Sequence, residues 1–281
     1  MHSPLPTFAL IATVAIFAPG LQAQQASLVK KWETEATLLT PESVRFDGRH
    51  KVLYVSNVEG SEPWTKDGAG SIAKVGLDGK VIAARWITGL EAPKGIGLHK
   101  GRLYVADIDR VAVIDIAKGV IERFIEVPGS KRLNDVSVDA SGDVYVSDMG
   151  GTKIYVIRNG SPSVYLEGFK RPNGVLAHKG SLYVLDAENL LKFGSDKKRE
   201  VIVDGLDPSS DGIEHVKGDT FLVTCWTGLI YLVEGHEKAL LLDTRAQKSN
   251  TADIGYDAKT RTVYVPTFFK NSVAAYDLKL K

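Results

Sequence analysis

Residues 132–148 decide how the rest of the chain is interpreted. They begin with Arg132-Leu133-Asn134-Asp135-Val136 and end with Gly142-Asp143-Val144-Tyr145-Val146-Ser147-Asp148. Polar turns stand at both ends, a glycine turn stands in the middle, and apolar residues alternate with other residues between them. Such alternation around a glycine turn is typical of a pair of antiparallel strands. The stretch therefore predicts a β-hairpin.

The centre of the second strand recurs along the chain with separations of 38 to 50 residues. The copies are Leu53-Tyr54-Val55, Leu103-Tyr104-Val105, Val144-Tyr145-Val146, Leu182-Tyr183-Val184, Phe221-Leu222-Val223 and Val263-Tyr264-Val265. No helical period is apparent in the copies. In the second copy, strands are expected at 95–99, 102–107, 112–115 and 121–124. Four strands in a repeat of about 40 residues are typical of a propeller blade, so the sequence predicts an all-β, six-bladed β-propeller with four antiparallel strands per blade.

The last copy lacks a fourth strand, because its third strand ends near Asp277. Residues 28–39, ahead of the first copy, look like a strand and belong to no repeat. An open blade would expose a sheet edge. We therefore expect this N-terminal strand to complete the sixth blade, within a single domain over residues 24–281.

The bulk composition excludes several kinds of partner. The 281 residues carry a net charge of +1 with the charges interspersed, so neither nucleic acid nor a membrane surface is expected as a partner.

Residues 8–18 form an uncharged apolar run followed by Pro19-Gly20 and Ala23. This layout predicts a signal peptide over residues 1–23, cleaved after Ala23, and a periplasmic or secreted monomer that leaves the membrane.

Cys225 is the only cysteine, so the exported domain must be stable without a disulfide. A nucleophilic thiol would need a histidine or a cation beside it. We favour a small buried apolar side chain at this position. The sequence also lacks a Gly-x-Ser-x-Gly elbow, a His-Glu-x-x-His helix and paired CxxC motifs, which argues against serine or zinc chemistry.

Alignment of the six repeats on their first strands reveals one variable column. Its members, from the first repeat to the sixth, are Glu42, Lys94, Asn134, Asn173, Asp211 and Ala252. First strands line the central channel of a propeller, so these side chains should converge on one axis. Two carboxylates and two amide carbonyls would make an all-oxygen site, which suits Ca²⁺ better than zinc or copper. The metal ligands predicted are Glu42, Asn134, Asn173 and Asp211.

Members of the column could also have purely structural roles. Any single Asn, Asp or Glu before a strand often only bonds its own turn. Lys94 would oppose a cation, and a hairpin centred on residues 100–101 would place it opposite Asp107, as a structural pair. Alternatively, Lys94 binds a carboxylate or phosphate of a substrate.

The interval between the first two copies is about ten residues longer than the others, and the excess lies in residues 58–70. This loop follows the second strand of the first repeat, so it opens on the same face as the column. It carries Trp64 between flanking glycines. The loop is either a lid over that face or a surface elaboration.

The chain resembles the senescence-marker-protein/gluconolactonase family and, more distantly, paraoxonase and diisopropyl fluorophosphatase. The resemblance spans about residues 28–281 and rests on the repeats together with Pro41-Glu42, 132–135, 172–174 and 210–212. It implies a calcium or other divalent ion held by Glu42, Asn173 and Asp211. Asn134 is implied as a further ligand or substrate contact, Arg132 as a substrate contact, and Asp211 as base or nucleophile. The activity implied is hydrolysis of lactones or related esters.

These residues support a coherent hypothesis. A cation would polarise a lactone carbonyl, Asp211 would take a proton from water while partly exposed, and Arg132 would orient the substrate, with Lys94 and Trp64 as further contacts. Asp135 is assigned to its own turn. The ring formed by Asn57, Asp107, Asp148, Asp186, Cys225 and Thr267 at the second-strand ends should brace the column. The competing hypothesis is a non-catalytic propeller that binds a small ligand or a protein on the same face.

Overall fold

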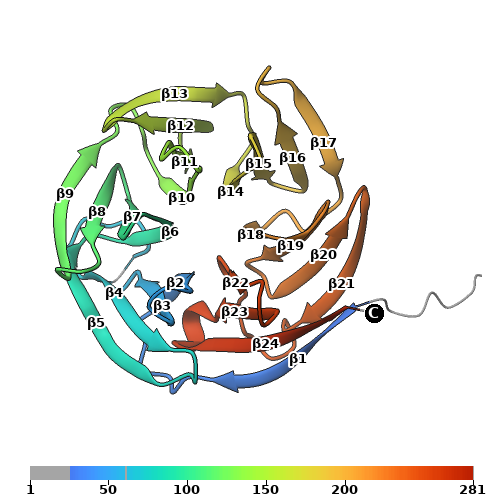
Figure 1. Ribbon diagram of the computed structural model, residues 1–281, viewed down its shortest axis with the longest axis horizontal. Helices are drawn as coiled ribbons and strands as arrows, with labels where there is room; N and C mark the ends of the chain where they lie inside the picture. Colours follow the sequence, from blue (N-terminus) through green and yellow to red (C-terminus); the bar gives the residue numbers. More distant parts are fainter. Residues whose placement is uncertain (1–25, 61, 281) are drawn as a thin grey trace, which may run out of the picture.

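The computed structural model describes residues 26–60 and 62–280, which form six four-stranded antiparallel sheets around a central axis (Figure 1). The predicted signal peptide and its cleavage site lie outside the described residues. The predicted six-bladed propeller is confirmed. No helix in the described ranges is long and apolar enough to cross a membrane.

Five blades follow the chain from the axis outward. Blade 1 contains β2(Pro41–Asp47), β3(Val52–Asn57), β4(Gly70–Gly76) and β5(Val81–Leu90). Blade 2 contains β6(Pro93–His99), β7(Arg102–Asp107), β8(Arg110–Asp115) and β9(Val120–Glu126). Blade 3 contains β10(Leu133–Val138), β11(Val144–Asp148), β12(Lys153–Arg158) and β13(Ser161–Glu167). Blade 4 contains β14(Pro172–His178), β15(Ser181–Asp186), β16(Asn189–Phe193) and β17(Arg199–Val203). Blade 5 contains β18(Ser210–Lys217), β19(Thr220–Cys225), β20(Leu229–Glu234) and β21(Glu237–Asp243).

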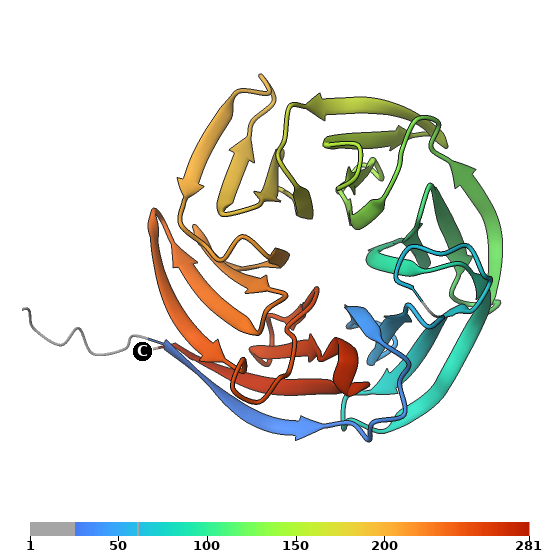
Figure 2. The ribbon, with the colours of Figure 1, turned by 180° about the vertical axis from the view of Figure 1, so that it is seen from behind.

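Blade 6 joins the two ends of the chain. It contains β22(Gly255–Asp257), β23(Thr262–Pro266) and β24(Val273–Leu280), and its outer strand is β1(Ala26–Glu33). The ladder runs from Ala26 opposite Leu280 to Glu33 opposite Ala274. Figures 1 and 2 show β1 along the outer edge of β24. The predicted closure is confirmed, with a strand that begins and ends earlier than the expected 28–39.

The core lies between neighbouring blades. Strand β3 is buried along its whole length, whereas the outer strand β9 is largely exposed, and the same contrast recurs around the ring. Tyr54 of blade 1, for example, packs with Ile96 and Leu103 of blade 2. Full burial of one large apolar side chain contributes about 1.5–3 kcal/mol. The alternating residues of the repeats thus form a chain of interfaces that needs no disulfide.

A β-bulge interrupts the innermost ladder at the column in five of the blades. In blade 2, Pro93 pairs with Asp107 but Ile96 pairs with Val105, so the first strand contains one extra residue. The extra residue disrupts the ladder locally and leaves a backbone group unpaired. In blade 3 the hydroxyl of Ser147 accepts the N–H of Asp135, which satisfies that group. Ser56 and Thr224 do the same for Ser43 and Gly212.

The innermost strands approach one another closely beneath the column. A side chain on Gly95 would overlap the backbone and carboxylate of Asp135 in the next blade, and one on Gly174 would overlap the carbonyl of Asp211. Glycine is the residue that allows such an approach. These contacts fix the neighbouring blades at a spacing that brings the column residues together at one end of the channel.

Candidate functional site

Five polar side chains of the column are buried at the start of the innermost strands. Glu42, Lys94, Asn134, Asn173 and Asp211 are only 3–6% exposed and come from β2, β6, β10, β14 and β18. Buried polar groups are costly unless they are paired. The structure places the four predicted ligands at the same end of the channel. Their roles as ligands stay predictions. Asp211 is buried, so the expectation that it is partly exposed is wrong, because the neighbouring blades enclose the first strand.

Two oxygen atoms in this group have no hydrogen-bond partner among the described residues. They are Oε2 of Glu42 and Oδ1 of Asn173, and both are buried. The other end of the Asn173 amide donates from Nδ2 to Oδ1 of Asp211 at 2.7 Å. Buried acceptors are normally satisfied. Unpartnered oxygens beside a buried carboxylate are what a cation site requires, so the residues fit a divalent ion.

Burial is the main cause of the shifted pKa values of the two carboxylates in the site. Burial raises the pKa of Glu42 well above its usual range, and the nearby Asp211 and Asp135 raise it further, although Lys94 opposes them. Burial also raises the pKa of Asp211 to about 7, and the hydrogen bond from Asn173 limits this rise. A bound cation would stabilise both carboxylates in their ionised form.

The donor set consists of two carboxylates and two amides. Within residues 26–60 and 62–280, no group of three or more His, Cys, Asp and Glu side chains is placed to hold a metal. The amide Nδ2 of Asn134 lies 4.0 Å from Sδ of Met149. That contact leaves its carbonyl oxygen available, as the prediction of Asn134 as a further neutral ligand requires. Such a set is appropriate for Ca²⁺, which accepts amide oxygens and water.

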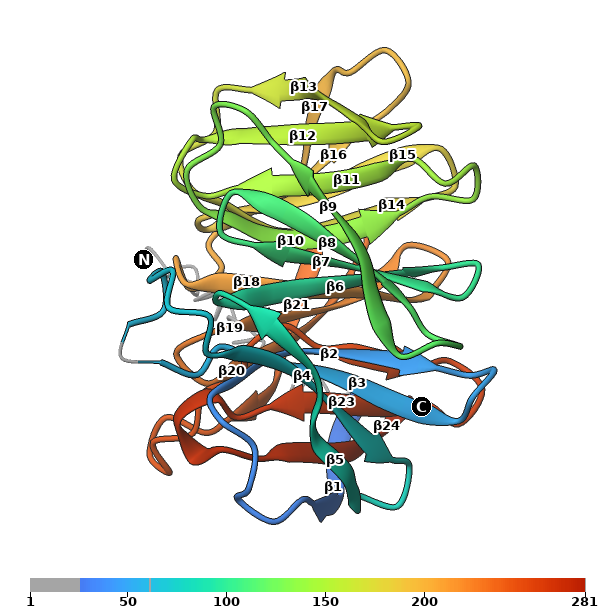
Figure 3. The same ribbon diagram turned by 90° about the vertical axis from the view of Figure 1, so that its left-hand side faces the viewer.

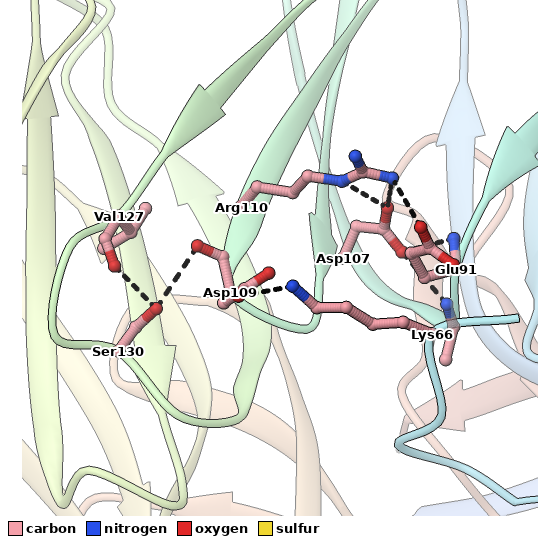
Figure 4. Close-up of polar contacts among 8 residues, drawn as sticks. Lys66, Glu91, Asp107, Asp109, Arg110, Val127 and Ser130 are labelled. Carbon is pink, nitrogen blue, oxygen red and sulfur yellow. Dashed lines mark hydrogen bonds and ion pairs between the residues drawn. The ribbon is translucent and has the colours of Figure 1, made fainter. Parts of the chain in front are cut away.

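Lys94 does not pair with Asp107, so that prediction is wrong. The bulge places Pro93 opposite Asp107 and removes Lys94 from the regular register. Figure 4 shows that Asp107 instead binds Arg110, at 3.0 Å, and it also accepts the N–H groups of residues 91 and 92. The ammonium of Lys94 donates to the carbonyls of Pro63 and Ala92, at 2.8 and 3.4 Å.

The environment of Lys94 makes its ammonium unusual. Burial lowers the pKa of Lys94 to about 8, against the attraction of Glu42, Asp107 and Asp211. The ammonium also lies 4.6 Å from the ring centroid of Trp64. Lys94 is therefore a buried positive charge between the carboxylates and the long loop, and not part of an ion pair within blade 2.

The long loop lies over the column face, as expected. Its Trp64 ring also lies 5.6 Å from the guanidinium of Arg132 in blade 3. Lys66 binds Asp109 of blade 2 at 2.6 Å (Figure 4). Figure 3 shows the loop between β3 and β4 projecting from one face of the disc. The loop of blade 1 therefore reaches over the site to blades 2 and 3. Its movement as a lid stays a prediction.

The ring at the second-strand ends braces the turns before the first strands. Asp148 accepts the N–H groups of Lys131 and Arg132, and Asp186 accepts those of Lys170 and Arg171. The expected bracing role is confirmed at these positions. Cys225 of the same ring is fully buried, and burial raises the pKa of its thiol to about 12. It is therefore a structural residue.

Two residues near the column were not predicted from the sequence. The charge of Arg171 limits the rise in the pKa of Asp211. The repeat alignment placed Arg171 level with Arg132, which could have revealed it. Asp253 is buried beside the hydroxyl of Ser43 in blade 1. Nothing in the sequence indicated that contact, because residues 251–254 precede β22 and pair across the blade boundary.

Asp135 has a wider role than its own turn. One carboxylate oxygen accepts the N–H of Val136, and the other accepts the N–H of Val175 in blade 4, at 2.7 Å. Below it, Arg45 of β2 binds Glu214 of β18 across the channel at 3.2 Å. A cavity of about 10 Å³ remains at this level, enough for about one water.

Comparison with known proteins identifies a matching family and solved structures of similar fold. Residues 40–226 match the model of the SMP-30/Gluconolactonase/LRE-like region. Among curated proteins there is no match. A solved structure provisionally named a gluconolactonase is 15% identical, with a TM-score of 0.66 over 92% of this chain and 94% of that one.

Two further solved structures have a similar fold. Virginiamycin B lyase from Staphylococcus aureus is 10% identical, with a TM-score of 0.61 over 91% of this chain and 99% of that one. A chain of a nidogen/laminin complex is 19% identical, with a TM-score of 0.65 over 76% and 84%. At these identities the likeness shows the fold alone. The family model, which covers more than half of the chain, shows that this protein belongs to the SMP-30/gluconolactonase/LRE-like family.

Proposed function

We propose that the protein is a divalent-metal-dependent hydrolase of lactones or related esters, with Ca²⁺ as the preferred ion. The observation that carries the proposal is the pair of buried, unpartnered oxygens on Glu42 and Asn173 beside Asp211. Membership of the SMP-30/gluconolactonase/LRE-like family supports it. Glu42, Asn134, Asn173 and Asp211 would hold the ion, which when bound supplies a positive charge that polarises an ester carbonyl.

Asp211 is the proposed general base. Burial raises its pKa to about 7, and a bound cation would lower that pKa and keep the carboxylate in the basic form that accepts a proton from water. The hydrogen bond from Asn173 uses one carboxylate oxygen and fixes the orientation of the group. The second oxygen would accept the proton of an attacking water.

Arg132 and Lys94 are the proposed substrate contacts. Arg132 lies two residues before Asn134, the column residue of blade 3, and its backbone N–H donates to Asp148. Lys94 carries a buried positive charge and can pair with a carboxylate or another anionic oxygen of the substrate. Trp64 covers both cations and excludes water from this side of the site.

The setting of the reaction is also proposed. The N-terminal apolar run would direct the chain to the periplasm or the medium, where calcium is abundant, and the mature chain would act there as a monomer on a small molecule. Mass spectrometry of the mature protein would test cleavage after Ala23. A mature chain that still began at Met1 would contradict export.

Thermal melting of the mature protein with EDTA and with Ca²⁺ tests the metal site. An ion that binds only the native state raises the stability by about 2.7 kcal/mol at a hundredfold excess over its dissociation constant. No shift with any divalent ion would remove the metal site from the proposal.

A panel of lactones then separates a hydrolase from a binding protein. Asp211→Asn should abolish calcium-dependent hydrolysis, because an amide cannot take up the proton. A matched control is Asp196→Asn, at an exposed turn far from the column in sequence and in the fold. Unchanged hydrolysis by Asp211→Asn would exclude the assigned base.

A further inference from the structure

An aromatic cluster lies on the column face at blades 5 and 6. The ring centroids of Trp226 and Phe268 are 5.4 Å apart, those of Trp226 and Phe269 are 5.8 Å apart, and those of Phe268 and Phe269 are 4.8 Å apart. Phe269 is 66% exposed, the highest value among the exposed large apolar side chains of the described chain. An exposed phenylalanine on top of two packed rings offers an apolar surface to a ligand.

The topology places this cluster beside the candidate site. Trp226 follows β19, and the short 3₁₀ helix η1(Phe268–Lys270) follows β23. Both segments connect the second and third strands of a blade, so they open on the same face as the starts of the first strands. The long loop with Trp64 is the equivalent connection in blade 1. The corresponding connections of blades 2 and 4 are tight turns.

Hydrogen bonds tie the cluster to the residues just before the two strands that carry the carboxylates. Trp226 donates its N–H to the carbonyl of Ser209, two residues before Asp211. On the other side, the side chain of Asn271 accepts the N–H of Thr40, two residues before Glu42, at 2.9 Å. The aromatic surface is therefore held in a fixed position relative to the proposed ion.

The column itself changes character at this place. Its sixth member, Ala252, is fully buried and packs with Trp226 and Phe268 and with Val58 and Ala92 of blades 1 and 2. Every other blade provides a polar side chain at the equivalent position. The site thus has a polar arc and one apolar sector, which lies between Asp211 and Glu42 in the ring.

The turn that presents Phe269 has an unfavourable backbone. Phe268 adopts a φ of +51°, a left-handed conformation that bulky residues disfavour. Its carbonyl accepts the N–H of Asn271 at 3.0 Å, and Ser272 and Thr267 close the turn behind it. Strain of this kind persists where the surrounding structure enforces it, often at ligand sites. In this turn Phe268 is buried and Phe269 is exposed.

We propose that Trp226 and Phe269 form a subsite for the apolar part of the substrate. The proposal rests on the proposed function and specifies its substrate class: a lactone or ester that carries an alkyl or aryl substituent, in preference to a polyhydroxylated sugar lactone. The carbonyl would face the polar arc, and the substituent would lie on the aromatic surface at blade 6. A sugar ring would instead place hydroxyl groups against the apolar ring of Phe269.

A series of lactones with one ring and increasing chain length tests the subsite. For δ-valerolactone, δ-octanolactone and δ-decanolactone, kcat/KM should rise about fourfold for each methylene that is buried. Phe269→Ala should flatten this dependence. Ile82→Ala, which removes an apolar side chain that is 58% exposed on β5, should leave the dependence intact. Because Phe269 is exposed, the variant should keep its melting temperature.

Binding of non-hydrolysable lactams gives an independent measurement. Tryptophan fluorescence should report tighter binding of δ-decanolactam than of δ-valerolactam, and Phe269→Ala should remove the difference. If lactones are cleaved without any dependence on chain length, the subsite is refuted and the hydrolase stands. If lactams bind as expected but no lactone is cleaved, the subsite stands and the hydrolase fails. If neither binding nor cleavage depends on chain length, the subsite is wrong in either case.

Discussion

Replacement of Glu214 by glutamine should change how the stability of the propeller depends on pH. Glu214 lies in the channel beneath the column and binds Arg45 at 3.2 Å. Despite this partner, the pKa of Glu214 is raised to about 7, mainly by burial and also by the nearby Asp135. The desolvation of the carboxylate therefore exceeds the attraction of the guanidinium, which is itself partly exposed.

The sign and size of the effect follow from this shift. The folded pKa of Glu214 lies above its value of about 4.5 in an unfolded chain. The native protein therefore keeps a proton that the unfolded chain has lost, and this contribution to stability, present below about pH 4.5, is lost as the pH rises through about 7. The difference corresponds to about 3 kcal/mol at about 1.4 kcal/mol per pH unit.

Urea unfolding at pH 5.5 and pH 8.5, with EDTA present, measures this effect. The wild type should be more stable at the lower pH, and Glu214→Gln should reduce that difference by about 2 kcal/mol, because glutamine keeps the shape without titrating. Glu200→Gln is the matched control on an outer strand, where the side chain is largely exposed. An unchanged difference in Glu214→Gln would refute the assignment of the excess proton to this carboxyl.

Two further predictions concern the column and its support. Lys94→Met should tighten Ca²⁺ binding about tenfold in titration calorimetry, since a buried ammonium opposes a nearby cation; weaker binding would instead mean that Lys94 organises the site. Gly95→Ala should lower the free energy of unfolding in urea by about 1–3 kcal/mol, because the new methyl group overlaps Asp135 in the next blade. Gly48→Ala, which meets only the edge of the Phe46 ring, should have a smaller effect.

The repeats determined the fold because their evidence is local. The triplet around Tyr54 recurs five more times, and each copy needs only its own alternation to define a hairpin. Closure of the ring was also predictable, since a missing fourth strand near Asp277 and a spare strand near Leu28 have a single economical solution. The alignment of the repeats on their first strands likewise placed Glu42 and Asp211 at one level of the channel. In the structure both side chains are buried at the starts of their first strands.

The partners of individual side chains were less predictable. The symmetric hairpin around residues 100–101 put Lys94 opposite Asp107, but one extra residue in the strand shifts the register. The actual acceptor, the carbonyl of Pro63, lies in a loop whose path depends on tertiary contacts. The same is true of Asp253, which meets Ser43 only because blades 6 and 1 are neighbours in the closed ring.

The bulge that misled the register prediction also explains why the column can vary. A residue in a regular ladder must suit the alternation of its strand, and a change there alters the sheet. At the bulge, a hydroxyl such as that of Ser147 supplies the missing hydrogen bond, so the side chain of Asn134 is freed from that requirement. One blade can therefore provide a carboxylate, another an ammonium and a third an alanine without loss of the propeller. Chemistry at the axis is in this way separated from the pattern that specifies the fold.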